Sequence, residues 1–272
     1  MGERPTVPVG PFHVADLERA ALVETIAEKA AARLGRRPYV AFALHVGGLN
    51  ARHDRAYVAA HQRADLTYAD GASVVLLARL AGARRIQRAG TTDIGWDVLA
   101  ALAARLGRPL RLGLVGGSPG LAARAGEVLT ERLDVETRFT CDGYRENWTE
   151  PLDQLRRAGC DAVVIGLGAP REMHWVIEHL AELPPGLILT CGGWFGFVVG
   201  AETRAPITAQ RLGLEWMFRL AQAPRRLGGR YARGAWSTLV LAAAAIVPRP
   251  AASSDCGAAH PPPPVVPSRR LG

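Results

Sequence analysis

Two glycine-rich segments of the sequence place backbone amides where they could meet a phosphate. V-G-G-S-P-G covers Val115–Gly120 and G-L-G-A-P-R-E covers Gly166–Glu172, and each follows an apolar run and precedes a helical pattern. Amides at the start of a helix attract anions, and glycine lets a phosphate approach the backbone closely. A plain strand-to-helix turn also needs glycine, so the first segment by itself fits both interpretations equally well. Open α/β sheets bind ligands at the ends of such strands, and the two segments therefore support each other.

Asp70 is the candidate acid–base residue. It lies in T-Y-A-D-G, residues 67–71, directly before the helical pattern S-V-V-L-L-A-R-L. An aspartate in this position can cap a helix, and the residue pattern alone favours that structural interpretation. The alternative is a carboxylate at the sheet edge that takes a proton from an acceptor hydroxyl. Asn50 also follows an apolar run, where it could bind substrate or close a turn.

Neither the histidines nor the cysteines have the spacing of a metal or nucleophile site. The residues in question are His45, His53, His61, His174 and His179, and Cys141, Cys160, Cys191 and Cys256. They form no H-E-x-x-H or C-x-x-C pattern and no metal-ligand spacing. We therefore expect no bound metal, buried free thiols in the apolar runs, and a reducing compartment.

The elements that must position these residues alternate between strand and helix patterns. Apolar runs at 38–46, 111–115, 135–141, 161–168 and 187–191 predict buried strands, and helical patterns lie at 17–34, 72–82, 93–106, 119–133, 149–158 and 171–182. Such alternation is typical of a parallel sheet with helices on both faces. We predict a Rossmann-like α/β core over 16–200, with Asp16 capping its first helix. Residues 1–15 are expected to form a flexible leader.

The sequence changes character after residue 200. Between 204 and 233, seven arginines accompany a single acidic residue, Glu215, and aromatic side chains lie among them. We predict a basic helical appendage over 201–247 and a disordered tail over 248–272, which holds seven of the 19 prolines. The arginines could simply be solvated on a packed helix. They could instead bind a pyrophosphate and draw the helix to anionic lipid headgroups.

The formal net charge of +8, in which Lys29 is the only lysine, favours a polyanionic partner. Nucleic acid, a sugar nucleotide and an anionic membrane all fit this charge. No helix-turn-helix, RNP or zinc signature is present, so we expect no nucleic-acid partner. The longest apolar run, 239–247, is about half the roughly 20 residues that a spanning helix needs, and the N-terminus lacks the pattern of a secretory signal. We therefore expect a protein that does not cross a membrane but can lie on one.

Taken together, these motifs resemble the WecG/TagA/CpsF family of glycosyltransferases over about residues 36–233. The motifs that carry the resemblance are L-N at 49–50, T-x-A-D-G at 67–71, G-G-S-P-G at 116–120, D-G-Y at 142–144, G-L-G-A-P-R-E at 166–172, R-A-P at 204–206, G-L-E-W-M-F-R-L at 213–220, A-P-R-R at 223–226 and R-Y at 230–231. The last four in order are the specific signal, because glycine-rich loops alone occur in many folds.

The resemblance implies an inverting, metal-independent glycosyltransferase. Its donor would be a nucleotide sugar, commonly UDP-linked N-acetylmannosamine, and its acceptor a polyprenyl-diphosphate-linked glycolipid at the cytoplasmic face of the inner membrane leaflet. The appendage would close over the site and touch the membrane, and a homo-oligomer is compatible with the pattern. Asp70 matches the catalytic base, which reverses the preference for a helix cap. The implied substrate-binding residues are Asn50, Gly116, Gly117, Tyr144, Gly168, Pro170, Glu172, Gly193, Arg204, Arg219, Arg226 and Arg230.

Three departures from the family pattern lie at the predicted substrate edge. Gly48 stands where the family has threonine, the family's P-K-Q-E becomes P-R-E-M at 170–173, and Gly196 replaces an aspartate. These changes indicate either a different donor or acceptor, as in a specialised natural-product pathway, or a descendant that binds nucleotide sugar without catalysis. A nicotinamide-dependent oxidoreductase is disfavoured, because the sequence has no G-x-G-x-x-G fingerprint.

Overall fold

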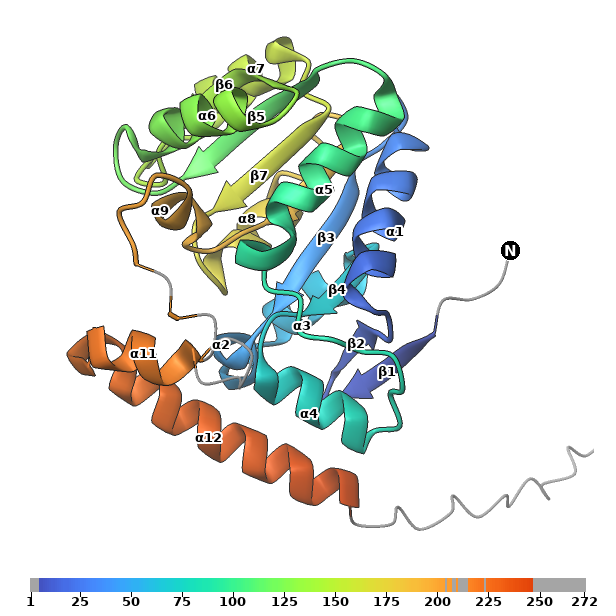
Figure 1. The fold of residues 1–272 in the computed structure, drawn as a ribbon, viewed down its shortest axis with the longest axis vertical. Helices are drawn as coiled ribbons and strands as arrows, with labels where there is room; N and C mark the ends of the chain where they lie inside the picture. The colour runs from blue at the N-terminus through green and yellow to red at the C-terminus, as the bar shows by residue number, and fades with distance from the viewer. Residues whose placement is uncertain (1–4, 204, 207–208, 210–214, 223, 247–272) are drawn as a thin grey trace, which may run out of the picture.

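The computed structural model describes residues 5–203, 205–206, 209, 215–222 and 224–246. It contains a two-stranded antiparallel sheet and a six-stranded parallel sheet with the strand order β4-β3-β8-β7-β5-β6 (Figure 1). The strands are β1 Thr6–Val9, β2 Phe12–Ala15, β3 Tyr39–Leu44, β4 Leu66–Ala69, β5 Leu110–Gly116, β6 Val135–Cys141, β7 Ala162–Gly166 and β8 Leu187–Thr190. The predicted α/β class with a parallel sheet is therefore confirmed.

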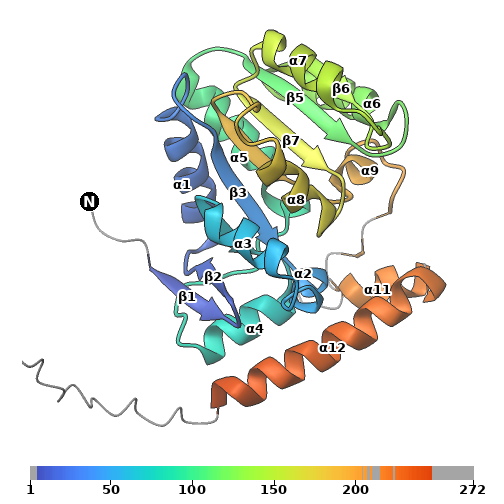
Figure 2. The same cartoon turned by 180° about the vertical axis from the view of Figure 1, so that it is seen from behind.

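Helices cover both faces of the large sheet (Figures 1 and 2). One face carries α1 Arg19–Ala31, α5 Thr91–Leu106, α6 Leu121–Arg132 and α9 Trp194–Val198. The other carries α3 Arg55–Arg63, α7 Thr149–Ala158 and α8 Arg171–Glu178, and this second core also receives α2 Val46–Asn50 and α4 Ala72–Leu80. The chain continues into α11 Glu215–Gln222 and α12 Pro224–Ile246.

The sequence of β3 shows why both faces must be covered. All six of its residues are buried. Tyr39, Ala41 and Ala43 belong to one hydrophobic cluster, whereas Val40, Phe42 and Leu44 belong to the other. Successive side chains of a strand point to opposite faces, so a continuous apolar run needs an apolar partner on each side. This is the physical basis of the strand predictions made from uninterrupted apolar runs.

The strand order fixes which loops can meet. β3 and β4 form one side of the sheet, β5 and β6 form the other, and β7 and β8 lie between them. Because all six strands are parallel, the loops that follow them emerge at the same edge. The loops after β7 and β8 must therefore lie between the loop after β4 and the loops after β5 and β6.

The N-terminal segment is more ordered than the sequence predicts. β1 and β2 pair through Val9 and Phe12 in a tight hairpin, so the expectation of a flexible leader over 1–15 is wrong for residues 6–15. Val9, Phe12 and Val14 are buried in the second core. The hairpin was missed because its strands are only four residues long and include a proline.

Asp16 does not cap the first helix. The residue at the N-cap of α1 is Glu18, which makes no side-chain cap hydrogen bond. The Asp16 carboxylate instead accepts hydrogen bonds from the backbone amides of Arg84, Arg85 and Ile86, at 3.0, 2.8 and 2.7 Å. The aspartate thus satisfies three amides of a loop about 70 residues away, and the residues next to Asp16 in the sequence do not indicate this contact.

Three further comparisons with the sequence predictions concern two short elements, the cysteines and the C-terminal tail. β4 and α3 were not predicted, since β4 has only four residues and α3 is short and polar. Cys141, Cys160 and Cys191 are buried and free, as expected. The predicted tail over 248–272 lies outside the residues that the structure describes.

α12 runs alongside α2 and α4, and α11 folds back against it (Figures 1 and 2). Gly234 of α12 lies so close to Val46 that a Cβ at this glycine would clash with the valine side chain. Further along, Leu241 packs on Gly10 at the turn of the hairpin. Among the residues that the structure describes, no helix has the length and apolar character needed to cross a membrane.

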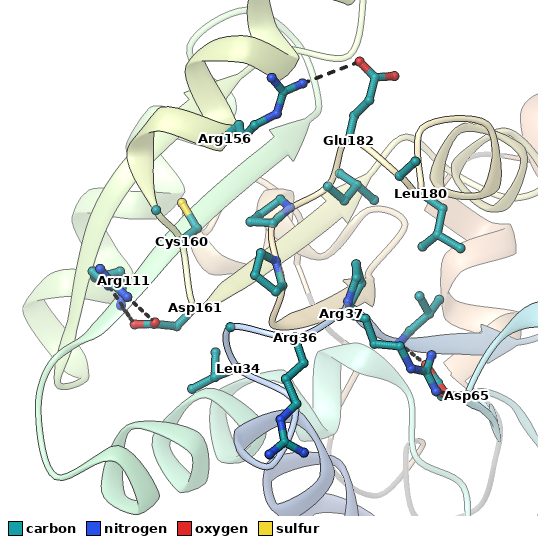
Figure 3. Close-up of a pocket in the computed structure, with 18 of the residues that line it drawn as sticks. Leu34, Arg36, Arg37, Asp65, Arg111, Arg156, Cys160, Asp161, Leu180 and Glu182 are labelled. Carbon is teal, nitrogen blue, oxygen red and sulfur yellow. Dashed lines mark hydrogen bonds and ion pairs between the residues drawn. The ribbon is translucent and has the colours of Figure 1, made fainter.

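A cavity of about 910 Å³ lies at the amino edge of the sheet, opposite the glycine-rich loops (Figure 3). Its arginines are largely engaged in ion pairs. Asp161, 1% exposed, accepts hydrogen bonds from Arg108 at 2.7 and 2.9 Å and from Arg111 at 3.1 and 2.7 Å. Burial opposes ionisation of Asp161, but the two guanidinium groups outweigh it and hold the pKa of the carboxyl well below its ordinary value. This cluster fastens the start of β7 to β5.

Replacing Asp161 should therefore destabilise the fold. Asp161→Asn leaves two arginines without their buried counter-charge, and we expect the free energy of unfolding in urea to fall by about 3 kcal/mol at pH 7. The wild-type advantage should shrink as the pH falls below the ordinary carboxyl value of 3.8, because Asp161 then takes up a proton in the unfolded chain while it is still ionised in the native ion pair. Asp153→Asn, which removes an exposed pair with Arg156, should cost no more than about 0.5 kcal/mol. Equal losses in the two variants would contradict this account.

Candidate functional site

The carboxyl edge of the sheet brings together residues from loops that are far apart in the sequence. The predicted site residues that the structure places at this edge are Asn50 after β3, Asp70 after β4, Gly116 and Gly117 at the end of β5, Tyr144 after β6, Gly168, Pro170 and Glu172 after β7, and Gly193 after β8. They form two groups. Asn50 and Asp70 lie on the β3–β4 side, and Gly116, Gly117 and Tyr144 lie on the β5–β6 side.

The glycines after β5 allow the loops on this side to pack backbone against backbone. Gly116 has φ +131°, and a Cβ there would collide with the carbonyl oxygen of Gly166 at the end of β7. The Gly117 amide donates to that same carbonyl at 3.1 Å, and the Gly143 amide donates to the Gly117 carbonyl at 2.9 Å. Gly116 and Gly117 are thus required by loop packing itself. The same packing leaves the edge bare of side chains, so a ligand can come close to the backbone.

Tyr144 follows Gly143, next to the glycines at the end of β5, and its side chain extends into solvent. Its side chain is 74% exposed, while its backbone amide donates to Asp142 Oδ1 at 2.9 Å and holds the turn after β6. Arg171, at the start of α8, donates to the Gly143 carbonyl at 2.8 Å and ties this turn to the loop after β7. An exposed aromatic ring beside a glycine-rich edge can stack on a planar ring such as a nucleobase.

Asp70 is not a helix cap. The residue at the N-cap of α4 is Gly71, and the helix start has no side-chain cap hydrogen bond. The Asp70 amide donates to the Leu44 carbonyl at 2.8 Å, which fixes the residue at the end of the paired strands. A Cβ at Gly90 would lie 2.7 Å from Asp70 Oδ1, so the absence of a side chain there makes room for the carboxylate. The structural interpretation favoured by the local pattern is therefore wrong.

Glu172 is buried at the centre of the edge, with 1% of its surface exposed. Its Oε2 accepts hydrogen bonds from the Gly168 and Gly192 amides, both at 3.1 Å. Burial, the largest cause, and the negative charge of Asp70 together raise the pKa of Glu172 to about 7, against the opposing effect of the amide hydrogen bonds. The site thus contains two neighbouring carboxyl groups, one of which titrates near neutrality.

Asn50 is engaged with α12. Its Nδ2 donates to the Arg230 carbonyl at 3.1 Å, and its Oδ1 accepts from Ser237 Oγ at 3.1 Å. Arg52 completes the contact by donating to Ser237 Oγ at 2.6 Å. The side chain that the resemblance assigned to substrate thus holds α12 against α2 in this structure.

This contact brings the Arg230 side chain to the end of β3. Its Nη2 lies 3.3 Å from Nδ1 of His45, which caps α2 by accepting from the Gly47 and Gly48 amides. Of the other predicted arginines, Arg204 lies outside the described residues, and the side chains of Arg219 and Arg226 are likewise not described. Among the described residues, Arg230 is thus the predicted arginine that lies at this edge.

Two of the three departures from the family pattern have a steric explanation. A Cβ at Gly48 would come under 3 Å from both Tyr57 Oη and Leu44 Cδ1, so the tyrosine hydroxyl fills the space that a side chain at 48 would need. At Gly196 the nearest side-chain atom to such a Cβ is Glu202 Cγ at 3.1 Å. A carboxylate from Glu202 thus lies beside the position where an aspartate is missing.

Sequence reasoning missed the segment Gly90–Asp93, which opens α5 beside Asp70. Thr91 is buried, and its hydroxyl donates to the Thr190 carbonyl at 3.0 Å, which leaves it to accept the 2.7 Å hydrogen bond from Tyr68 Oη. Asp93 pairs with Arg88 at 2.9 Å. The available signal was G-T-T-D ahead of a helical pattern, a typical helix start that was not connected to the Asp70 loop.

Comparison with protein families supports the resemblance. The model described as the glycosyl transferase WecG/TagA/CpsF family matches residues 7–251, which is most of the chain. The match includes the hairpin, the complete parallel sheet and α12.

The packing at Gly48 predicts a compensating pair of substitutions. Gly48→Ala should lower the free energy of unfolding by about 2 kcal/mol, because the new methyl group clashes with Tyr57 Oη. Tyr57→Phe removes a hydroxyl that has no hydrogen-bond partner among the described atoms, so it should cost little and should rescue much of the Gly48→Ala loss. Urea unfolding of the four proteins in the cycle measures the coupling.

Gly228→Ala is the matched control for this cycle. Gly228 lies within α12 with nothing inside 4 Å of an added Cβ, so alanine should leave stability unchanged or raise it slightly. A Gly48→Ala loss of the same size with and without the Tyr57 hydroxyl would contradict the steric explanation.

Proposed function

The chain belongs to the WecG/TagA/CpsF family of glycosyltransferases, and from this premise we propose that it transfers a sugar, with inversion, from a UDP-sugar to a polyprenyl-diphosphate-linked glycolipid. The family implies a role in cell-surface polymer biosynthesis. The observation that carries the proposal is the position of Asp70, a carboxylate that is not the N-cap of α4 and that lies at the same sheet edge as Gly116 and Gly117. An N-acetylmannosamine-like sugar is the donor group that the resemblance favours.

The two sides of the edge suit the two substrates. On the β5–β6 side, Gly116 and Gly117 leave the backbone accessible and Tyr144 offers a ring for the nucleobase, which favours the UDP moiety there. On the β3–β4 side, Asp70 faces the position of the acceptor. Arg230 reaches this edge from α12, where its guanidinium can neutralise a diphosphate.

The chemical step requires one proton acceptor and one site of positive charge. Asp70 takes the proton of the acceptor hydroxyl as the hydroxyl oxygen bonds to the anomeric carbon. The bond from that carbon to the diphosphate oxygen breaks on the opposite face, which inverts the anomeric configuration. The negative charge gained by the departing UDP is stabilised by arginine, with Arg230 as the described candidate, and the reaction therefore needs no metal ion.

An apolar surface next to the site suits a membrane-bound acceptor. Trp236 and Leu239 of α12 are 67% and 64% exposed, and Leu76 of neighbouring α4 is also exposed. The exposed Arg225 and Arg233 lie on the same helix. Aromatic and aliphatic side chains flanked by arginine are typical of a helix that lies in an anionic membrane interface. We therefore place the protein peripherally at the inner face of the plasma membrane.

A changed donor or acceptor is the second candidate, and it is favoured over a descendant that only binds. Glu202 places a carboxylate beside Gly196, and Tyr57 fills the space at Gly48, so other side chains occupy the surroundings of both positions. Asp70 is retained in a position that binding alone would not require. A panel of UDP- and dTDP-sugars, offered with glycolipid acceptors, tests this point.

The role of Asp70 predicts a loss of transfer without a loss of donor binding. Asp70→Asn should lower kcat by 10² to 10⁴-fold, as expected for removal of a general base, when the acceptor mass is followed by mass spectrometry. UDP, and not NAD, should raise the melting temperature of both wild type and variant. Asp97→Asn, on an exposed face of α5, is the matched control and should be fully active. Unchanged transfer by Asp70→Asn would rule out this mechanism.

Membrane association predicts a loss of vesicle binding in the full chain when the apolar surface is made polar. Trp236→Ser combined with Leu239→Ser should weaken binding to phosphatidylglycerol vesicles by roughly tenfold or more, and high salt should weaken wild-type binding. Tyr144→Ser removes an equally exposed aromatic ring at the other end of the sheet edge and should bind like wild type. Identical binding by all three proteins in sedimentation would exclude α12 as the docking surface.

A further inference from the structure

We propose that Glu172 is a positioning residue for sugar transfer, which fastens the loop after β7 to the loop after β8 and controls, through its charge, how readily Asp70 accepts a proton. The proposal rests on the proposed role of Asp70 as the catalytic base. It concerns a group that does not need to touch the reacting atoms, because it acts through the loops and through Asp70.

One carboxylate oxygen of Glu172 joins the loops after β7 and β8 by accepting a hydrogen bond from each. Oε2 accepts from Gly168, in the loop after β7, and from Gly192, in the loop after β8. Both glycines have positive φ, +77° and +54°, and this turn of the backbone presents their amides to the same atom. β7 and β8 are adjacent, and Ile165 pairs with Thr190 at their ends. The bridge therefore holds the two central loops of the edge in a fixed relation.

The effect of the Glu172 charge on Asp70 depends on the groups that surround these two carboxyl groups. Burial raises the pKa of Tyr57 from α3, Tyr68 from β4 and Cys191 after β8, and the negative charge of Glu172 adds to the rise in each. None of these neighbours is a cation. Asp70 interacts with Glu172 in the same way. Glu172 thus has buried neutral groups and one carboxylate around it, where interaction between charges is poorly screened.

Asp70 has further charged neighbours on its other sides. Asp93 Oδ2 lies 3.4 Å and Asp70 Oδ1 lies 2.7 Å from the same point, the Cβ position at Gly90, and Asp93 is paired with Arg88. Across α2, His45 and Arg230 contact each other, and Asp54 belongs to the surroundings of Tyr57. Electrostatic coupling is reciprocal, so Glu172, once it is ionised, must make Asp70 a stronger base by the same amount by which Asp70 disfavours that ionisation.

Glu172→Gln separates the fastening from the charge. The amide oxygen of glutamine can still accept from Gly168 and Gly192, and the side chain has nearly the same size, so the variant should fold. Glu172 is charged only above its pKa of about 7, so the wild-type kcat/KM should rise several-fold between pH 6 and pH 8 as this charge makes Asp70 a stronger base. Glu172→Gln should lack this rise and should therefore have a several-fold lower kcat/KM at pH 8. An unchanged pH profile would overturn the proposal and leave Glu172 a purely structural residue.

Two further variants control this experiment. Glu178→Gln makes the same chemical change on the same helix, away from the edge, and its pH profile should coincide with that of the wild type. Glu172→Leu removes both hydrogen bonds, and we expect it to lose activity at every pH together with thermal stability. A shift in the Glu178→Gln profile equal to that of Glu172→Gln would also overturn the proposal.

Protein stability can be measured without catalytic turnover, so its pH dependence tests the coupling of Glu172 to Asp70 independently of the proposed function. In the folded chain Glu172 keeps its proton up to a pKa of about 7, whereas in the unfolded chain it loses the proton near 4.5. The folded state therefore binds the extra proton, and wild-type stability should fall as the pH rises from 4.5 to about 7. Glu172→Gln lacks this proton, so its melting temperature relative to wild type should rise across the same window and level off above it.

Asp70→Asn then tests the coupling directly. Without the neighbouring charge, Glu172 should titrate at lower pH, so the fall in stability should be centred at lower pH than in the wild type. A fall centred at the same pH in both proteins would overturn the proposal. If these stability results hold but no sugar donor is turned over by the wild type, the proposed function fails while the coupling of Glu172 to Asp70 stands.

Discussion

Parallel pairing of six strands is the constraint on which the site depends. Parallel strands send all their following loops to one edge, so residues as distant in sequence as Asp70, Gly116 and Gly192 must share it. Crowding at that edge then selects residue types. Gly116 lies against the Gly166 carbonyl, where no Cβ fits. The glycine-rich character of the motifs is thus first a requirement of backbone packing and then an opportunity for ligand binding.

Charge is distributed unevenly along this edge. Its carboxyl groups include Asp70 after β4, Asp93 near Asp70 at the start of α5, and buried Glu172, whose ionisation the charge of Asp70 opposes, while α12 brings Arg230 to the end of β3. Such an arrangement can remove a proton at one point and stabilise an anion at another. The amino edge is different, because its arginines are mostly neutralised by Asp65, Asp161 and Glu182 and serve to hold the fold together.

Two departures from the family pattern coincide with side chains that crowd the positions concerned. Gly48 has no side chain because Tyr57 fills the volume above it, and Gly196 has none beside Glu202. In both cases another side chain lies in or beside the space that the family residue would occupy. Glu172 goes further, since it introduces a buried charge where the family has a neutral amide.

The sequence by itself determined the fold class, because uninterrupted apolar runs such as β3 can be satisfied only by helices on both faces. It also identified the family, because the order of the motifs along the chain can be recognised without knowing which residues contact one another. Only the tertiary structure decided what polar side chains bind. Asp16 satisfies amides about 70 residues away, and Asn50 donates a hydrogen bond to a helix 180 residues later. The reason is physical: apolar periodicity reports burial, which is a local average, whereas the partner of a carboxylate or an amide is set by strand order and long-range packing.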